Sequence, residues 1–221
     1  MNLAPFFPEG GPFPSVVRSA HHTRTAAKAA GNPVLVLVGG YAGSGKTEFA
    51  RFLSDLTGWT ILDKDALTRR MTERLLTSLG GDPHDRHTDL YATEVRPVEY
   101  QCLLSAARTN VEAGIPLILA APFLEELQDP SWLTRLTNQS ATHGCDVTAI
   151  WVQSDPDTMH DHLEHRDAPR DTWKLANWDQ YTSTLNTADS PPNTHITVDN
   201  RHGAAVSLAE QTRRALQRIT A

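Results

Sequence analysis

The sequence predicts an α/β fold in which a mostly parallel sheet of five strands lies between two layers of helices. Short apolar runs, several rich in valine and isoleucine, alternate along the chain with longer segments of helical character. Runs of this kind are typical of strands that are buried on both faces of a parallel sheet. Their alternation with helices favours right-handed crossover connections and therefore a three-layer arrangement.

One domain is expected over residues 33–221, preceded by an extension over residues 1–32. A chain of 221 residues, of which 39% are hydrophobic, fits a single core. Residues 1–14 are rich in proline and glycine, and residues 15–30 have a weakly helical pattern that ends at Gly31.

The predicted elements follow in order from Pro33. Strands are expected over residues 34–38, 59–62, 115–120, 147–152 and 195–198. Helices are expected over residues 46–57, 66–79 and 96–113, and glycines follow the last two of them. The first strand, helix and second strand together form a βαβ unit.

Composition excludes several functional classes. The net charge of −6 gives no general attraction to nucleic acid, so a small substrate is expected instead. No apolar run reaches the roughly 20 residues of a membrane helix, and the N-terminus lacks a secretion signal, so we expect a cytoplasmic protein. Cys102 and Cys145 form no CxxC pair and are interpreted as free buried thiols.

Residues 40–47 read Gly-Tyr-Ala-Gly-Ser-Gly-Lys-Thr and match the Walker A pattern GxxxxGK[ST] in full. Glycines allow backbone N–H groups to turn toward phosphates, and the following helix presents its positive end to the same anion. We expect Lys46 to reach the β- and γ-phosphates and the Thr47 hydroxyl to bind Mg²⁺. The predicted nucleotide-binding residues are Gly40, Gly43, Ser44, Gly45, Lys46 and Thr47. The motif therefore predicts a P-loop NTPase fold that binds ATP and Mg²⁺.

With this motif, the chain resembles the P-loop small-molecule kinases, in particular the group that includes chloramphenicol phosphotransferase, zeta toxins and gluconate kinase. The resemblance covers about residues 33–220 and depends on the order and spacing of the elements, with the P-loop as its specific part. It implies a phosphotransferase with an alcohol group as acceptor. It also implies catalytic roles for Lys46 and for residues outside the P-loop.

The resemblance implies that Asp65 is the general base. In this group an aspartate just after the second strand accepts the proton of the substrate hydroxyl, and residues 59–67 offer Asp65 at that place, with Asp63 two residues earlier. An alternative is that Asp65 only caps a helix that starts at Ala66, and both roles are compatible.

The resemblance also implies a mobile lid that carries two catalytic arginines, Arg166 and Arg170. They lie after the fourth strand in an RxxxR-like pair, where a guanidinium can stabilise charge on the transferring phosphoryl group. Surface ion pairing is the alternative for either arginine alone.

No acidic residue ends the third strand, where many P-loop NTPases hold an aspartate for Mg²⁺. Either Asp63 supports the water shell of the metal, or Mg²⁺ relies on Thr47 and ATP alone. Asp63, Arg96 and Tyr100 are the predicted substrate contacts, with helix packing and surface pairing as the alternative for Arg96 and Tyr100. Glu125 and Glu126, just past the third strand, are a further possibility.

Other polar and aromatic groups are not assigned. The histidines at 160, 162 and 165 lack a zinc spacing, because on a helix only His162 and His165 share a face. Loop polarity explains His84 and His87 as well as substrate contact does. Trp173 and Trp178 are candidates to pack on adenine or on the core.

The sequence therefore predicts an ATP-dependent phosphotransferase acting on a hydroxyl of a small molecule, such as an antibiotic, nucleoside or sugar derivative. Three rivals stay open. They are a zeta-toxin-like nucleotide-sugar kinase, a polynucleotide 5′-kinase, which would need a basic groove, and a non-catalytic ATP-binding sensor.

Overall fold

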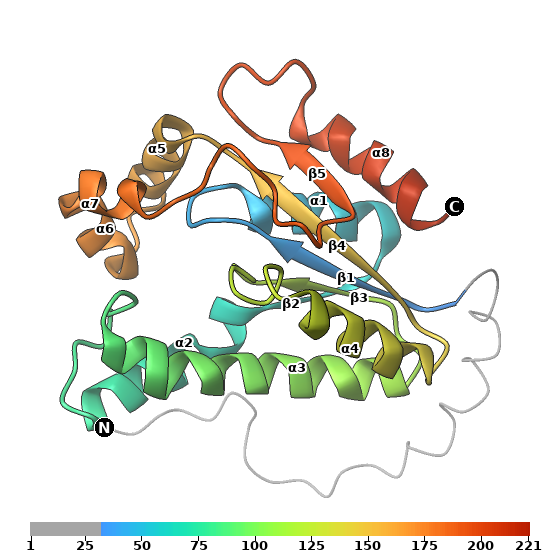
Figure 1. Ribbon diagram of the computed structural model, residues 1–221, viewed down its shortest axis with the longest axis horizontal. Helices are drawn as coiled ribbons and strands as arrows, with labels where there is room; N and C mark the ends of the chain where they lie inside the picture. Colours follow the sequence, from blue (N-terminus) through green and yellow to red (C-terminus); the bar gives the residue numbers. More distant parts are fainter. Residues whose placement is uncertain (1–31) are drawn as a thin grey trace, which may run out of the picture. The chain divides into compact units, whose positions relative to one another are not determined.

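Five parallel strands form the central sheet in the order β2-β3-β1-β4-β5 (Figure 1). The computed structural model describes residues 32–221. The strands are β1 (Val34–Gly39), β2 (Thr60–Asp63), β3 (Leu117–Ala120), β4 (Asp146–Gln153) and β5 (Ile196–Asp199). Every neighbouring pair is parallel, so the predicted fold class is confirmed and the sheet is parallel throughout.

Eight α-helices connect and cover these strands within the described residues. They are α1 (Lys46–Thr57), α2 (Lys64–Ser78), α3 (Arg96–Glu112), α4 (Pro130–Ala141), α5 (Pro156–Arg166), α6 (Thr172–Ala176), α7 (Trp178–Ser183) and α8 (Leu208–Ile219). A π-helical turn, η3 (Tyr91–Val95), runs directly into α3, and a 3-10 turn, η4 (Pro169–Asp171), runs into α6.

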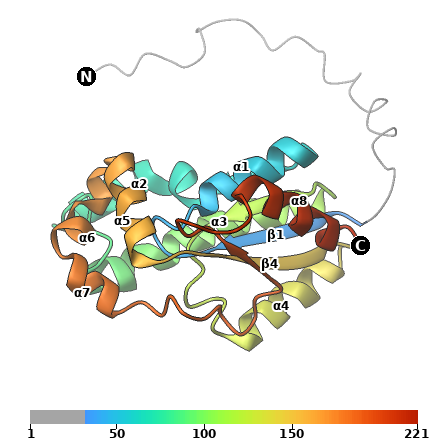
Figure 2. The ribbon, with the colours of Figure 1, turned by 90° about the horizontal axis from the view of Figure 1, so that it is seen from above.

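The two faces of the sheet bury separate sets of side chains, as alternation along the strands requires. Helices α3 and α4 cover one face, and α1 and α8 cover the other (Figures 1 and 2). On β1, Leu35 and Leu37 pack toward α3 and α4, whereas Val36 and Val38 pack toward α1 and α8. This arrangement is the expected three-layer sandwich.

The carboxyl ends of the strands carry the segments that matter for function. The P-loop follows β1, Asp63 ends β2, and α5 follows β4. Helices α5, α6 and α7 lie at the same end of the molecule as α2 in both ribbon views (Figures 1 and 2). These three helices, together with η4, are called the lid below.

The predictions for residues 1–14 and 15–30 lie outside the described residues, and the domain boundary at residue 33 stays a prediction. Among the residues that the structure describes, no helix combines the length and the apolar character that crossing a bilayer demands.

Candidate active site

The P-loop adopts a conformation that its glycines permit. Gly45 caps α1 with φ at 92°, and Gly43 has φ at 82°, both in the left-handed region that favours glycine. A Cβ atom on Gly43 would lie 2.5 Å from the backbone oxygen of Met159, so no larger residue fits there. The hydroxyl of Ser44 is buried and has no hydrogen-bond partner among the described residues. An orphaned donor in a loop of this shape fits an anionic ligand.

Two side chains from elsewhere hold the P-loop from outside. His162 Nδ1 lies 2.7 Å from the carbonyl oxygen of Gly43, and Asn200 Nδ2 donates to the carbonyl of Ser44 at 2.9 Å. They belong to α5 and to the loop after β5. Local sequence gave no signal for either contact, because both partners are more than 100 residues away from the loop.

The Lys46 side chain contacts the P-loop backbone. Its ammonium donates to the carbonyl of Tyr41 at 3.1 Å, and no carboxylate of the described residues lies within ion-pair distance. Burial lowers the pKa of Lys46 to about 8, although the nearby Asp65 counteracts the shift. A buried ammonium group without a carboxylate partner is strongly stabilised when an anion binds beside it.

Thr47 and Asp63 meet at the mouth of the P-loop. The Thr47 hydroxyl donates to Asp63 Oδ2 at 3.2 Å. Asp63 is paired in the sheet with Ala120, the last residue of β3, so it stands beside the position where an aspartate is missing. Both groups offer oxygen ligands, which Mg²⁺ prefers. The residues present therefore fit a magnesium site, and the support of the metal by Asp63 stays a prediction.

The interpretation of Asp65 as the cap of a helix starting at Ala66 is wrong. Helix α2 begins at Lys64, and Asp63 is its N-cap, with Asp63 Oδ1 accepting from the Ala66 N–H at 3.0 Å. The extended backbone of Asp63, with ψ at 126°, is the conformation that a cap requires. Asp65 lies in the first turn, so its carboxylate is free for other contacts.

Asp65 pairs with cations from two elements. Lys64 Nζ lies 3.0 Å from Asp65 Oδ1, and Arg170 Nε of the lid lies 3.2 Å from Asp65 Oδ2. Burial would raise the pKa of Asp65, but Lys64 and Arg170 lower it well below its usual range. The side chain is 37% exposed and can still be reached from outside. The structure thus brings two of the predicted catalytic residues into contact.

Arg166 has a different partner. Its Nε donates to Asp171 Oδ2 at 2.9 Å, and the side chain of Asp171 is 1% exposed. The ion pair fixes the guanidinium within the lid, close enough to Lys46 for their charges to interact. Arg166 is therefore ion-paired, but with a buried carboxylate and not at the surface as the alternative has it, and its charge still acts on Lys46.

A buried carboxylate that the sequence did not reveal lies behind Asp65. Glu99 of α3 is 2% exposed and accepts hydrogen bonds from Lys64 at 2.9 Å, Thr68 at 2.9 Å, Thr72 at 2.8 Å and Tyr91 at 2.7 Å. Since Lys64 also pairs with Asp65, this network fixes the position of Asp65 relative to α3. The three donors of α2 recur at every fourth residue, which is the only signal in the sequence.

Arg96 and Tyr100, two predicted substrate contacts, make internal contacts. Arg96 pairs with Glu126 at 2.8 Å and Glu125 at 3.1 Å, and its guanidinium lies 4.4 Å from the centre of the Tyr100 ring. The buried Tyr100 hydroxyl accepts from the N–H of Phe123 at 3.0 Å. Both residues brace the segment after β3, and a substrate role for them stays a prediction.

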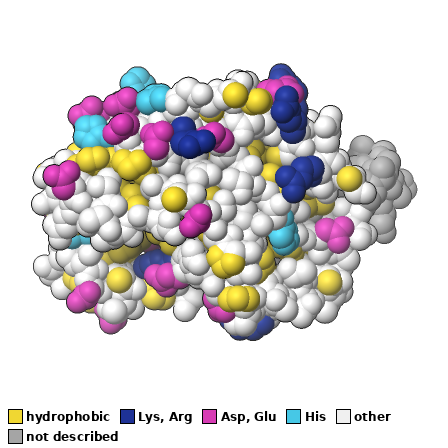
Figure 3. Space-filling view, turned by 45° about the horizontal axis from the view of Figure 1, so that its top comes forward, with side chains coloured by type: hydrophobic (Ala, Val, Ile, Leu, Met, Phe, Trp, Pro, Cys, Tyr) yellow, Lys and Arg dark blue, Asp and Glu magenta, His cyan; other side chains and the backbone are white. Residues whose placement is uncertain are grey.

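The histidines of α5 do not converge on one point. His162 contacts the P-loop, whereas His160 lies with Asp161 and Glu164, their ligand atoms within 4.8 Å of one another. Figure 3 shows histidine and acidic side chains gathered at one end of the face in view. Asp161 Oδ2 lies 2.9 Å from His202 Nε2, so this carboxylate already has a partner.

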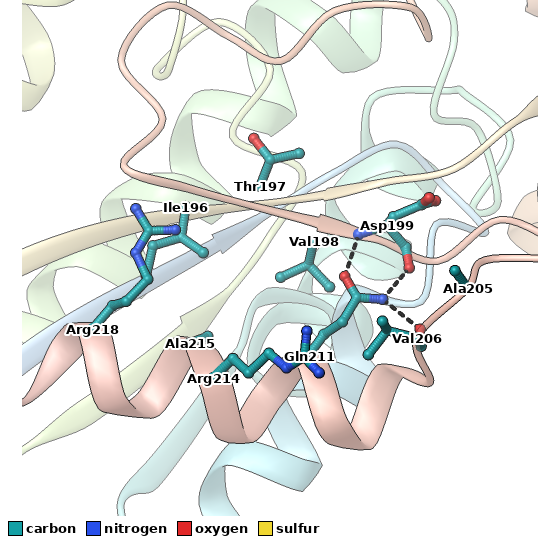
Figure 4. Close-up of a pocket in the computed structure, with 10 residues that line it drawn as sticks. All are labelled: Ile196, Thr197, Val198, Asp199, Ala205, Val206, Gln211, Arg214, Ala215 and Arg218. Carbon is teal, nitrogen blue, oxygen red and sulfur yellow. Dashed lines mark hydrogen bonds between the residues drawn. The ribbon is translucent and has the colours of Figure 1, made fainter.

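A pocket of about 390 Å³ lies away from the P-loop, between β5 and α8 (Figure 4). Gln211 spans it, accepting from the Asp199 N–H at 2.8 Å and donating to the carbonyls of Asp199 and Val206 at 2.6 and 2.8 Å. These bonds join the edge strand to α8. The lining contains no group of the predicted site, so we take the P-loop and the lid as the functional centre. The other lining residues are Ile196, Thr197, Val198, Ala205, Arg214, Ala215 and Arg218.

Comparison with protein families gives one match, a model described as AAA domain, over residues 35–188. The chain belongs to this family. The match spans the P-loop, Asp63, Asp65 and both lid arginines. A comparison with curated proteins finds no significant match.

Solved structures share the fold of this family member. A Chloroflexus aurantiacus protein provisionally described as a kinase has a TM-score of 0.60 at 19% identity, over 84% of this chain and 98% of its own. APS kinase CysC from Mycobacterium tuberculosis, in complex with AMPPNP and APS, has a TM-score of 0.53 at 17% identity, over 85% and 97%. A gluconokinase from Sinorhizobium meliloti has a TM-score of 0.51 at 20% identity, over 86% and 93%. The resemblance to P-loop small-molecule kinases is confirmed at the level of family and fold.

Proposed function

We propose that this protein is an ATP-dependent kinase that transfers the γ-phosphoryl group to a hydroxyl of a small molecule. The observation that carries the proposal is the contact of Asp65 with Arg170, at the end of β2 and close to Lys46. A carboxylate there faces the place where the acceptor hydroxyl must approach a nucleotide bound in the P-loop.

Each residue of the site then has a separate role in phosphoryl transfer. The P-loop N–H groups and Lys46 bind the phosphates, and Asp65 orients the acceptor hydroxyl and takes its proton late in the transfer. Mg²⁺, held by Thr47 and Asp63, would offset negative charge on the phosphate oxygens. Arg166 and Arg170 stabilise charge on the transferring group, once phosphate competes with Asp171 and Asp65 for their guanidinium groups.

The low pKa of Asp65 keeps its carboxylate ionised, as a group that orients the acceptor hydroxyl must be. Burial acts to raise it, but Lys64 and Arg170 more than compensate, so the carboxylate is ionised at neutral pH and accepts a hydrogen bond from the acceptor. The same contacts argue against a non-catalytic ATP sensor, for which no catalytic carboxylate is needed beside the P-loop. The solved structures named as kinases support the same reaction class.

An Asp65→Asn variant tests the proposal directly. It keeps the shape of the side chain but cannot accept a proton, so transfer from γ-labelled ATP to a panel of hydroxylated compounds should fall by about 10²-fold or more. Affinity for AMPPNP should change little. Asp55→Asn, the same replacement at an exposed position on α1, is the control and should retain full transfer.

Equal transfer rates for the two variants would remove Asp65 from the mechanism. If the native chain binds AMPPNP but labels no acceptor, the proposed kinase activity is itself wrong.

A further inference from the structure

Two segments from opposite sides of the site meet in a ring stack. The His87 ring lies on the Trp173 ring with centroids 3.9 Å apart and an angle of 12° between the planes. His87 belongs to the loop between α2 and α3, and Trp173 belongs to α6 of the lid. The residues next in sequence to this pair, Arg86 and Lys174, are both cationic, and their charges lie close enough to interact.

Arg86 has no carboxylate partner among residues 32–221. Its Nη1 donates to the carbonyls of Pro83 and Asp85 at 3.3 and 2.5 Å, and its Nε is buried without a partner in that range. The guanidinium lies 5.2 Å from the centre of the Tyr91 ring. A partly buried guanidinium with unused donors gains strongly from an anion that it can bind through two parallel hydrogen bonds.

Lys174 is in a similar position. Its side chain is 13% exposed, and its nearest carboxylate, that of Asp171, is 3.8 Å away and already bonded to Arg166. Burial lowers the pKa of Lys174, Asp171 acts to raise it, and the charges of Arg166, Arg170 and Arg86 act in the same direction as burial. Among the described residues, the positive charges of Arg86 and Lys174 are therefore not fully neutralised by nearby carboxylates.

The use of lysine in this chain points to the same place. Of 20 basic residues, only four are lysine, at positions 28, 46, 64 and 174. Within the described range, Lys46 lies at the P-loop, Lys64 pairs with Asp65, and Lys174 lies in the lid beside Arg170, to whose carbonyl it donates at 3.3 Å. Among the described residues, all three lysines therefore lie at the P-loop, beside Asp65 or in the lid.

A bound nucleotide does not account for all of these cations. The charge of Arg166 acts on Lys46 at the P-loop, and a triphosphate bound there would neutralise both groups. Arg86 lies over Tyr91, and the Tyr91 hydroxyl leads through Glu99 and Lys64 to Asp65. This chain of contacts connects Arg86 to the proposed base and not to the P-loop.

We propose that Arg86 and Lys174 bind an anionic group of the acceptor, a carboxylate, phosphate or sulfate, so that the substrate is a hydroxylated anion. That the anion belongs to the phosphate acceptor rests on the proposed kinase function. The anion site itself can be tested without catalysis. The guanidinium of Arg86 can donate to two oxygens of such a group, and Lys174 supplies a compact second charge.

Sulfate is the probe, titrated calorimetrically into the native protein saturated with AMPPNP and MgCl₂ so that the P-loop is filled. One saturable sulfate site is expected. Arg86→Gln and Lys174→Gln should each weaken sulfate binding about tenfold or more, the scale of one charge-assisted hydrogen bond. Arg135→Gln, which removes a 60% exposed arginine on α4, is the matched control and should bind as the native chain does.

Absence of saturable sulfate binding to the native complex, or binding to both variants within about twofold of the native value, would overturn the anion site. A loss of AMPPNP affinity as large as the loss of sulfate affinity in the same variants would also overturn it, because the two cations would then belong to the nucleotide site. None of these results depends on phosphoryl transfer. Failure of the kinase proposal, seen as absence of labelled product, is therefore a separate outcome.

Discussion

Burial disfavours the charged form of Lys46. Burial lowers its pKa to about 8, so between pH 8 and the ordinary value near 10.5 the folded chain binds fewer protons than the unfolded chain. Stability that depends on Lys46 therefore rises with pH across this window. A triphosphate beside the ammonium reverses the situation, because an opposite charge favours the protonated form.

Nucleotide binding at pH 9 should consequently take up about one proton. Titration of AMPPNP in buffers of different ionisation enthalpy measures this number directly. Lys46→Arg is the control, since an arginine stays protonated and the uptake should vanish while binding persists. If the native chain and the variant take up equal numbers of protons, the low pKa of Lys46 is not linked to the nucleotide.

The positions of single residues could be predicted from the sequence where they follow from neighbours in the chain. The P-loop, Asp63 and Asp65 all stand at fixed distances from a strand end, and the structure places them around one point. Arg86 and Glu99 were not assigned, because their partners lie on elements that only the folded chain brings together.

At the scale of elements, Glu99 connects α2, η3 and α3. Its carboxylate accepts four hydrogen bonds in a site that is almost free of solvent, and Lys64 supplies the opposite charge. Desolvation alone would raise the pKa of Glu99, but Lys64 and the hydroxyl donors lower it. The stability it supplies is thus present above its unfolded pKa and lost as the pH falls.

Glu99→Gln should lower the free energy of unfolding by about 3 kcal/mol at neutral pH, the usual scale for breaking a buried pair. Thermal unfolding followed by circular dichroism measures the change. Glu112→Gln, on the same helix but 40% exposed and paired with the exposed Arg108, is the control and should lower the free energy of unfolding far less, because solvent screens an exposed ion pair. Similar losses for the two variants would show that the buried network does not hold α2 on α3.

Element boundaries show where local patterns were insufficient. The sequence pattern allows Asp65 as the cap of a helix that starts at Ala66, whereas the structure has Asp63 as the cap and starts the helix at Lys64. Strand pairing sets the start of the helix. Because β2 pairs with β3 through Asp63, the chain stays extended up to this residue, and the helix can begin only at Lys64. The five strands were predicted more securely, since continuous apolar runs bounded by turns suit buried parallel strands.

Over residues 32–221, burial is uneven between the sheet and the lid. Strands β1 and β3 are buried throughout, and β4 is buried over most of its length. Helices α6 and α7 contain no buried residue, and polar contacts such as the Asp65 ion pair with Arg170 connect the lid to α2. Segments with few buried apolar contacts open at a low free energy.

Amide hydrogen exchange should therefore separate the sheet from the lid. Amides of α6 and α7 should exchange at least about 10³-fold faster than those of β1 and β3, because the strands exchange only through global unfolding. Saturation with AMPPNP and MgCl₂ should slow exchange in the lid, since phosphate offers Arg166 and Arg170 a shared partner across the P-loop. In an Arg166→Gln, Arg170→Gln double variant, the same concentration of bound nucleotide should leave lid exchange near its ligand-free rate, while the P-loop stays protected. Protection of α6 and α7 equal to that of β1 without nucleotide, or lid exchange that ignores the nucleotide in the native chain, would show that these helices are a fixed part of the fold and do not close over the substrate.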